Sequence, residues 1–181
     1  ILPVIKEFNG VIYDRQSKLN SKRYAFPDIY KNYIKPSVDF ASMMQIYKSY
    51  KVFLNVNTIT NSPSMLSRRV YELLASGTPV ISAPSLAIEK LFNGIIKTVS
   101  NKKQAIEETE KLLSDEFYHE KISHLGYRNV MQNHTYNNRK DFICNSLSIK
   151  TNNEIPLISV ICCTMRPQFI NRIVKNLTCQ N

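Results

Sequence analysis

A serine, two adjacent arginines and a glutamate lie within six residues near the middle of this chain: Ser67, Arg68, Arg69 and Glu72. Apolar residues at helical spacing follow, then Gly77 and a short apolar run at 79–82. The pattern predicts a helix over about 67–76, a glycine turn and a buried strand. We expect the Ser67 side chain to cap the helix and Gly77 to end it in a left-handed conformation.

The start of this helix is suited to an anionic ligand. The first N–H groups of a helix lack partners within it, and the helix dipole is positive at that end. Arginine side chains match phosphate oxygens, and a carboxylate accepts hydrogen bonds from ribose hydroxyls. The residues therefore favour a nucleotide-sugar site. The alternative is a plain ion pair between Arg69 and Glu72 on a solvated helix face.

The rest of the chain alternates short apolar runs with helical patterns, which predicts an α/β fold. Strands are expected at 11–13, 52–56, 79–82 and 95–99. Helices are expected at 39–50, 67–76, 85–92, 101–114, from there to about 133, and at 137–147. The segment 26–36 is expected to be irregular, and a stripe of large side chains is expected in the core: Phe40, Met43, Met44 and Tyr47. This order is that of a Rossmann-like, doubly wound parallel sheet with extra C-terminal helices.

Ligands of such sheets bind at the carboxyl ends of the strands. Several polar or loop residues fall at that edge: Asp14, Asn55, Asn57, Ser64 and Met65. Asn55 and Asn57 serve equally well as turn formers, and fixing the loop together with Arg15 is the alternative for Asp14. His134 is expected to cap a helix or to pack rather than to act as a base.

Composition limits the class of protein. The 181 residues are 43% apolar, enough for one domain with a real core. No apolar run approaches the roughly 18–20 residues that cross a bilayer, so we expect a cytoplasmic protein, with peripheral attachment to a membrane left open. The net charge of +10 lies mainly in the first hundred residues, with eight Lys/Arg against four Asp/Glu in 1–50 and five against two in 51–100. This suits a polyanionic ligand, but not nucleic acid, because no basic stripe is interleaved with aromatic residues.

The C-terminal residues differ in character from the rest. A polar linker over 150–154 precedes an apolar run at 157–164, which predicts a strand, and a helix over about 168–178. One strand and one helix do not make a domain, so we expect a first domain at 1–150 and a truncated second one at 151–181. The four cysteines show no paired metal spacing and are expected to be reduced core residues: Cys144, Cys162, Cys163 and Cys179.

The motif at 67–82, with Asn55-Val56-Asn57 before it and His134-Thr135-Tyr136 and Arg139 after it, resembles the C-terminal half of bacterial glycosyltransferases. The group it resembles is the spore-maturation, CgeB-like one, within the group 1 enzymes of GT-B fold. The resemblance covers about residues 10–148. It implies two Rossmann-like halves that face one another across a cleft, with the nucleotide-sugar donor in the C-terminal half. The other half, which usually supplies the catalytic base, would lie in the full-length protein and not in this chain.

By position, the resemblance assigns Glu72 to the ribose hydroxyls, and Arg69 and Arg68 to the diphosphate. It assigns Ser64, Met65 and Ser67 as backbone or hydroxyl donors at the helix entrance. Group 1 enzymes often carry a second glutamate near the transferred sugar, where this chain has Ser64, so the donor sugar is not identified. The resemblance further implies a glycan or cell-surface acceptor and no metal within 1–150.

Residues 158–167, followed by Asn176-Leu177-Thr178-Cys179-Gln180, resemble the opening of family 2 glycosyltransferases of GT-A fold. Their acidic metal-binding motif would lie beyond Asn181. Both resemblances predict a nucleotide-sugar-dependent glycosyltransferase fragment that catalyses little alone. The alternative is a non-catalytic nucleotide- or glycan-binding module within a larger assembly.

Overall fold

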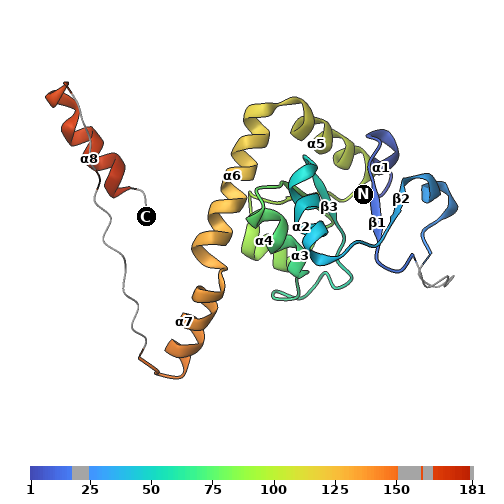
Figure 1. Cartoon of the computed structure of the whole chain (residues 1–181), viewed down its shortest axis with the longest axis horizontal. Coiled ribbons are helices and arrows are strands. Elements are labelled where there is room, and N and C mark those ends of the chain that lie inside the picture. Colours follow the sequence, from blue (N-terminus) through green and yellow to red (C-terminus); the bar gives the residue numbers. More distant parts are fainter. Residues whose placement is uncertain (18–24, 151–159, 161–164, 180–181) are drawn as a thin grey trace.

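The computed structural model describes residues 1–17, 25–150, 160 and 165–179. Figure 1 shows the chain, whose elements are, in order, α1 (Val4–Glu7), β1 (Ile12–Asp14), the 3-10 helix η2 (Asp28–Tyr33), β2 (Ile34–Pro36), α2 (Phe40–Ser49), β3 (Phe53–Asn55), α3 (Arg68–Ala75), β4 (Val80–Ser82), α4 (Leu86–Phe92), β5 (Lys97–Thr98), α5 (Lys102–Ser114), α6 (Glu116–Asn133), α7 (Tyr136–Ser146), the 3-10 helix η3 (Pro167–Phe169) and α8 (Ile170–Thr178). Of the strand predicted over 157–164, all but residue 160 lies outside the described residues, as do Cys162 and Cys163.

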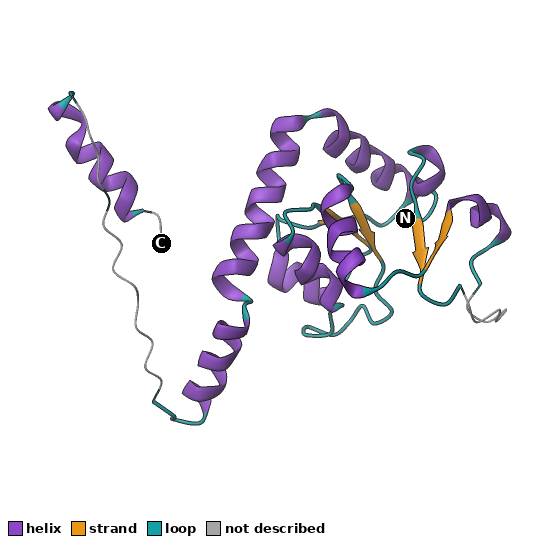
Figure 2. Ribbon diagram, viewed as in Figure 1, coloured by secondary structure: helices purple, strands orange, loops and turns teal. Residues whose placement is uncertain are grey.

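The strands pair in parallel in two small sheets, shown in orange in Figure 2. One sheet has the order β3-β4-β5, with Leu54 opposite Ile81 and Ser82 opposite Thr98. The helices α3 and α4 make the crossovers between its strands, as parallel pairing requires. The α/β class and the Rossmann-like strand–helix–strand order are therefore confirmed.

The second sheet, β1 with β2, corrects one prediction. The segment 26–36, expected to be irregular, contains η2 and then β2, in which Ile34 pairs with Ile12 of β1. Only Ile34 of β2 is half-buried, and the other two residues are exposed, so the strand carries no clear apolar pattern. The two sheets adjoin, because Ile12 packs in one apolar cluster with Leu54 of β3.

The helix α3 lies at the centre of the main core. Its buried residues Val70, Leu73 and Leu74 follow the three- and four-residue spacing of one helix face. They pack with residues of β4, α4 and α6, and each such burial contributes on the order of 1.5–3 kcal/mol. Gly126 of α6 allows a close approach, because a Cβ there would lie 2.7 Å from Cδ2 of Leu74.

The apolar stripe of α2 is only partly in the core. Asp39 caps this helix by accepting a bond from the Ser42 N–H at 2.8 Å, and Tyr47 is buried as predicted. Phe40, however, is 62% exposed, so its assignment to the core was wrong. It lies in the first turn of α2, where the guanidinium of Arg68 sits 5.9 Å from its ring centroid.

The C-terminal helices begin at clear caps. Asp115 caps α6, and Thr135 with Asn138 forms a capping box at α7. Within the described part of the chain, the helices are too short or too polar to span a bilayer. Cys144 of α7 is half-buried, whereas Cys179 is exposed after α8, a helix with no buried residue. The prediction of a core cysteine was therefore wrong for Cys179.

Candidate functional site

The first turn of α3 lies at the carboxyl edge of the three-stranded sheet, because α3 is the crossover that leaves this edge after β3. The connecting loop is tied to the start of α4 by a bond from the Leu86 N–H to the Thr60 carbonyl at 2.8 Å. The starts of α3 and α4 therefore lie at the same edge, as the fold class predicts for a ligand site.

Ser67 occupies the cap position of α3 without using its side chain. Its carbonyl accepts a bond from the Val70 N–H at 3.0 Å, but its hydroxyl makes no capping bond, so that detail of the prediction was wrong. Among the described residues, the N–H groups of Arg68 and Arg69 have no hydrogen-bond partner. The first turn thus presents open donors beside two exposed arginines. Gly77 ends the helix region with φ +74°, as predicted.

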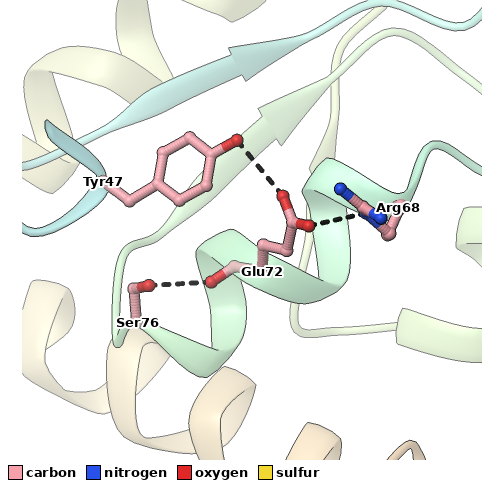
Figure 3. Close-up of polar contacts among 4 residues, drawn as sticks. All are labelled: Tyr47, Arg68, Glu72 and Ser76. Carbon is pink, nitrogen blue, oxygen red and sulfur yellow. Dashed lines mark hydrogen bonds and ion pairs between the residues drawn. The ribbon is translucent and has the colours of Figure 1, made fainter. Parts of the chain in front are cut away.

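Glu72 forms an ion pair within the helix, as in the alternative interpretation, but with a different arginine. Arg68 Nε lies 2.7 Å from Glu72 Oε1, a pair four residues apart that Figure 3 draws as a dashed line, whereas the alternative interpretation pairs Glu72 with Arg69. The side chain of Arg68 is 74% exposed and that of Glu72 only 19%. Within the described residues no carboxylate pairs with Arg69, an exposed residue whose guanidinium lies near enough to the Tyr47 hydroxyl to lower the pKa of that group.

Tyr47 is the residue that sequence reasoning missed at this site. Its hydroxyl donates to Oε2 of Glu72 at 3.3 Å, drawn in Figure 3, while the side chain is buried. Burial and then the Glu72 carboxylate raise the pKa of Tyr47, and the Arg69 guanidinium opposes that shift. Two charged residues of α3, Glu72 and Arg69, thus change the pKa of the Tyr47 hydroxyl on α2. The available signal was that a core tyrosine usually requires a partner for its hydroxyl.

Asn55, Asn57 and Ser82 form a hydrogen-bonded cluster at the carboxyl ends of β3 and β4, called here the amide cluster. Asn55 Nδ2 donates to Asn57 Oδ1 at 3.1 Å and to Ser82 Oγ at 3.0 Å. Asn57 Nδ2 donates to Ser82 Oγ at 3.1 Å and to the Ala83 carbonyl at 3.2 Å. Both amide hydrogens of each asparagine are therefore used inside the protein, in contacts that bridge the ends of β3 and β4. Ligand contacts through these residues stay a prediction.

The other predicted site residues lie in the surrounding loops. Asp14 Oδ1 accepts a bond from the Gln16 N–H at 2.8 Å, which fixes the loop after β1 in the second sheet. Ser64 and Met65 are exposed, and their N–H groups face Ser62 Oγ at 3.4 and 3.1 Å. The structure therefore brings Arg68, Glu72 and Tyr47 into direct contact, and leaves the roles of these loop residues as predictions.

His134 has a packing role, as expected. Its ring lies 5.3 Å from the ring centroids of Tyr71 and of Phe92. Arg139 Nη2 donates to its Nδ1 at 3.0 Å, which requires Nδ1 to be unprotonated. Burial and then the charge of Arg139 lower the pKa of His134.

A cavity of about 310 Å³ lies elsewhere, on the amino-terminal side of β3, between Lys51 and the helices α5 and α6. It contains none of the predicted site residues. Within the described residues, no three His, Cys, Asp or Glu side chains are grouped to hold a metal ion.

The parallel strands, their helical crossovers and the polar carboxyl edge define a Rossmann-like half domain. The model of the glycosyl transferase-like family matches residues 7–145, and the chain belongs to this family. Membership indicates sugar transfer in general, from a sugar donor to an acceptor. The matched range includes every predicted site residue. Comparison with curated proteins gives no match, and comparison with solved structures gives none either.

Proposed function

We propose that this chain binds a nucleoside-diphosphate sugar at the first turn of α3 and serves the transfer of the sugar to a glycan or cell-surface acceptor. One observation carries the proposal. A mostly buried carboxylate, that of Glu72, lies beside two exposed arginines at an open helix start. The group lies at the carboxyl edge of a parallel sheet in a glycosyl transferase-like chain.

The proposed roles follow from charge and exposure. Glu72 accepts hydrogen bonds from the ribose hydroxyls, and Arg69, which has no carboxylate partner among the described residues, binds the diphosphate. Arg68 joins the diphosphate by exchanging its bond to Glu72 for one to phosphate. Ser64, Met65 and Ser67 line the entrance. These donors stabilise the negative charge that grows on the departing diphosphate during transfer.

We further propose that residues 1–150 are the donor-binding half of a GT-B enzyme of CgeB-like type, and that 151–181 open a second, GT-A-like domain. The family match, which ends at residue 145, supports a boundary near 150. The resemblance of 158–167 to family 2 enzymes supports the second domain. In this proposal the catalytic base belongs to the other GT-B half, so this chain binds its donor weakly and catalyses little alone.

Isothermal titration of the 181-residue chain with UDP, GDP and their sugars tests the donor site. We expect binding, weakened roughly tenfold or more by Glu72→Gln and by Arg69→Ala, because each change removes a charged hydrogen bond. The matched control is Lys121→Ala on α6, which removes one exposed positive charge outside the site and is expected to leave affinity unchanged. No binding at millimolar nucleotide would overturn the donor site and favour the non-catalytic module.

A further inference from the structure

We propose that Tyr47 is a positioning residue that orients the Glu72 carboxylate toward the ribose diol of the bound nucleotide. The inference rests on the function proposed above and assigns a part of that site to α2. Tyr47 itself is too deeply buried to touch the ligand, with 4% of its surface exposed. It therefore acts through Glu72.

Two contacts hold Tyr47 in place, one through its ring and one through its backbone. The ring packs edge-on against Phe53 of β3, with centroids 5.6 Å apart and planes at 87°. Its backbone carbonyl accepts a buried hydrogen bond from Thr78 Oγ1 at 2.5 Å, which ties the end of α2 to the turn before β4. A tyrosine side chain has only two torsions that place its ring, so these contacts fix the position of its hydroxyl oxygen.

The two oxygens of Glu72 have partners of different kinds. Oε1 is bonded to Arg68, whose side chain is 74% exposed and therefore accessible to a phosphate. Oε2 is bonded to Tyr47, which is buried and cannot follow a ligand. When Arg68 moves to the diphosphate, the contact to Tyr47 remains and still defines the carboxylate rotamer. Figure 3 shows this arrangement, with Glu72 between its two partners.

The protonation of Tyr47 fits this role. Burial and the Glu72 charge raise the pKa of its hydroxyl, so it stays protonated at neutral pH and donates to the carboxylate. The O···O distance of 3.3 Å is long for such a bond, and bonds within binding sites often shorten when the ligand is present. A carboxylate held in one rotamer loses less entropy when it binds a diol than a freely rotating one.

The test compares a ribonucleotide with an analogue that has no diol. Isothermal titration measures the affinity of the 181-residue chain for UDP and GDP and for their 2′,3′-dideoxy counterparts, in wild type, Tyr47→Phe and Glu72→Gln. We expect the wild-type preference for the diol to be roughly tenfold or more, and Tyr47→Phe to reduce this preference several-fold. Affinity for the dideoxy analogues should not change in Tyr47→Phe. If the substitution only disturbed the fold, the affinity for the ribonucleotides and for the dideoxy analogues would fall by the same factor.

Tyr50→Phe is the matched control. Tyr50 lies one turn further on, packs edge-on against the same Phe53, and bonds through its hydroxyl to Tyr13 at 3.1 Å and not to Glu72. Removal of this hydroxyl should leave the diol preference unchanged. Thermal melts of both variants show whether folding is retained.

The outcomes separate this inference from the proposed function. If Glu72→Gln loses the diol preference while Tyr47→Phe keeps it, the positioning role is wrong and the donor site stands. Equal weakening of both ligands by Tyr47→Phe also overturns the positioning role. A wild-type chain without any diol preference, or without binding, overturns the role of Glu72 and this inference with it.

Discussion

Arg68 Nε lies 2.7 Å from Glu72 Oε1, one helical turn further along α3, so two opposite charges pair where an anion is expected to bind. Because the Arg68 side chain is 74% exposed, solvent screens the pair, and its contribution to stability is at most about 1 kcal/mol. A diphosphate can therefore compete for Arg68 at small cost. In doing so it exposes the carboxylate oxygen that a ribose needs.

This pair predicts that Arg68→Ala has opposite effects on the affinity for nucleosides and on the affinity for nucleoside diphosphates. Affinity for uridine and guanosine should rise several-fold, because Oε1 is no longer covered, whereas affinity for UDP and GDP should fall with the lost phosphate contact. Arg69→Ala is the comparison, because Arg69 covers no carboxylate. This change should lower the affinity for UDP without raising the affinity for uridine. NMR shift titrations measure both ligands. An unchanged uridine affinity in Arg68→Ala would show that Arg68 does not mask the site.

The amide cluster predicts a stability effect of Ser82→Ala. Ser82 is fully buried, and its hydroxyl accepts bonds from Asn55 and Asn57. Without it, two amide hydrogens at the sheet edge lose their acceptor, which should cost about 1–3 kcal/mol. Urea unfolding measures the change. Ser100→Ala, at an exposed position after β5, is the control and should lie within about 0.5 kcal/mol of wild type.

His134 predicts a pH dependence of stability. The fold holds the pKa of His134 below its usual value of 6.5. As the pH falls through 6.5 and below, the unfolded chain therefore binds a proton that the folded chain resists, and the free energy of unfolding decreases. Urea unfolding should be measured between pH 7.5 and 5.5, on the order of one unit either side of the usual histidine pKa. The free energy of unfolding should decrease less over this range for His134→Phe than for wild type.

Arg139→Ala tests the cause of this shift. Removal of the guanidinium beside Nδ1 takes away a charge that opposes protonation, so the pKa of His134 should rise toward its usual value. An NMR titration of the ring protons measures it directly. A pKa that stayed the same would mean that burial alone lowers it.

Gly126 predicts overpacking where α3 and α6 meet. A Cβ at this position would lie 2.7 Å from Cδ2 of the buried Leu74. Overpacking costs about 1–3 kcal/mol, against a gain in helix propensity of about 1 kcal/mol, so Gly126→Ala should destabilise by up to about 2 kcal/mol. Leu74→Val removes the Cδ2 atom, and the double variant should therefore be less unstable than the two single effects added together. Additive effects would contradict this close approach.

Local signals were sufficient to predict most of the elements. The helix expected at 67–76 is α3 (Arg68–Ala75), and the turn at Gly77 has the expected positive φ. Such signals depend on caps, glycines and the period of apolar residues, all of which lie within a few positions of one another. By contrast β2 was missed, because an exposed three-residue strand is defined by its pairing with β1 and not by its own pattern.

The amino-acid sequence alone determined the α/β order and placed two arginines and a glutamate at the start of a helix beside a strand's carboxyl end. Only the tertiary structure decided that Glu72 contacts Arg68 and Tyr47, and that Phe40 lies outside the core. Helical spacing brings both Arg68 and Arg69 near Glu72 and cannot choose between them. The choice depends on how α2 packs against α3. That packing includes the contact between Tyr47 and Glu72, which lie 25 residues apart in the sequence, so no local pattern encodes it.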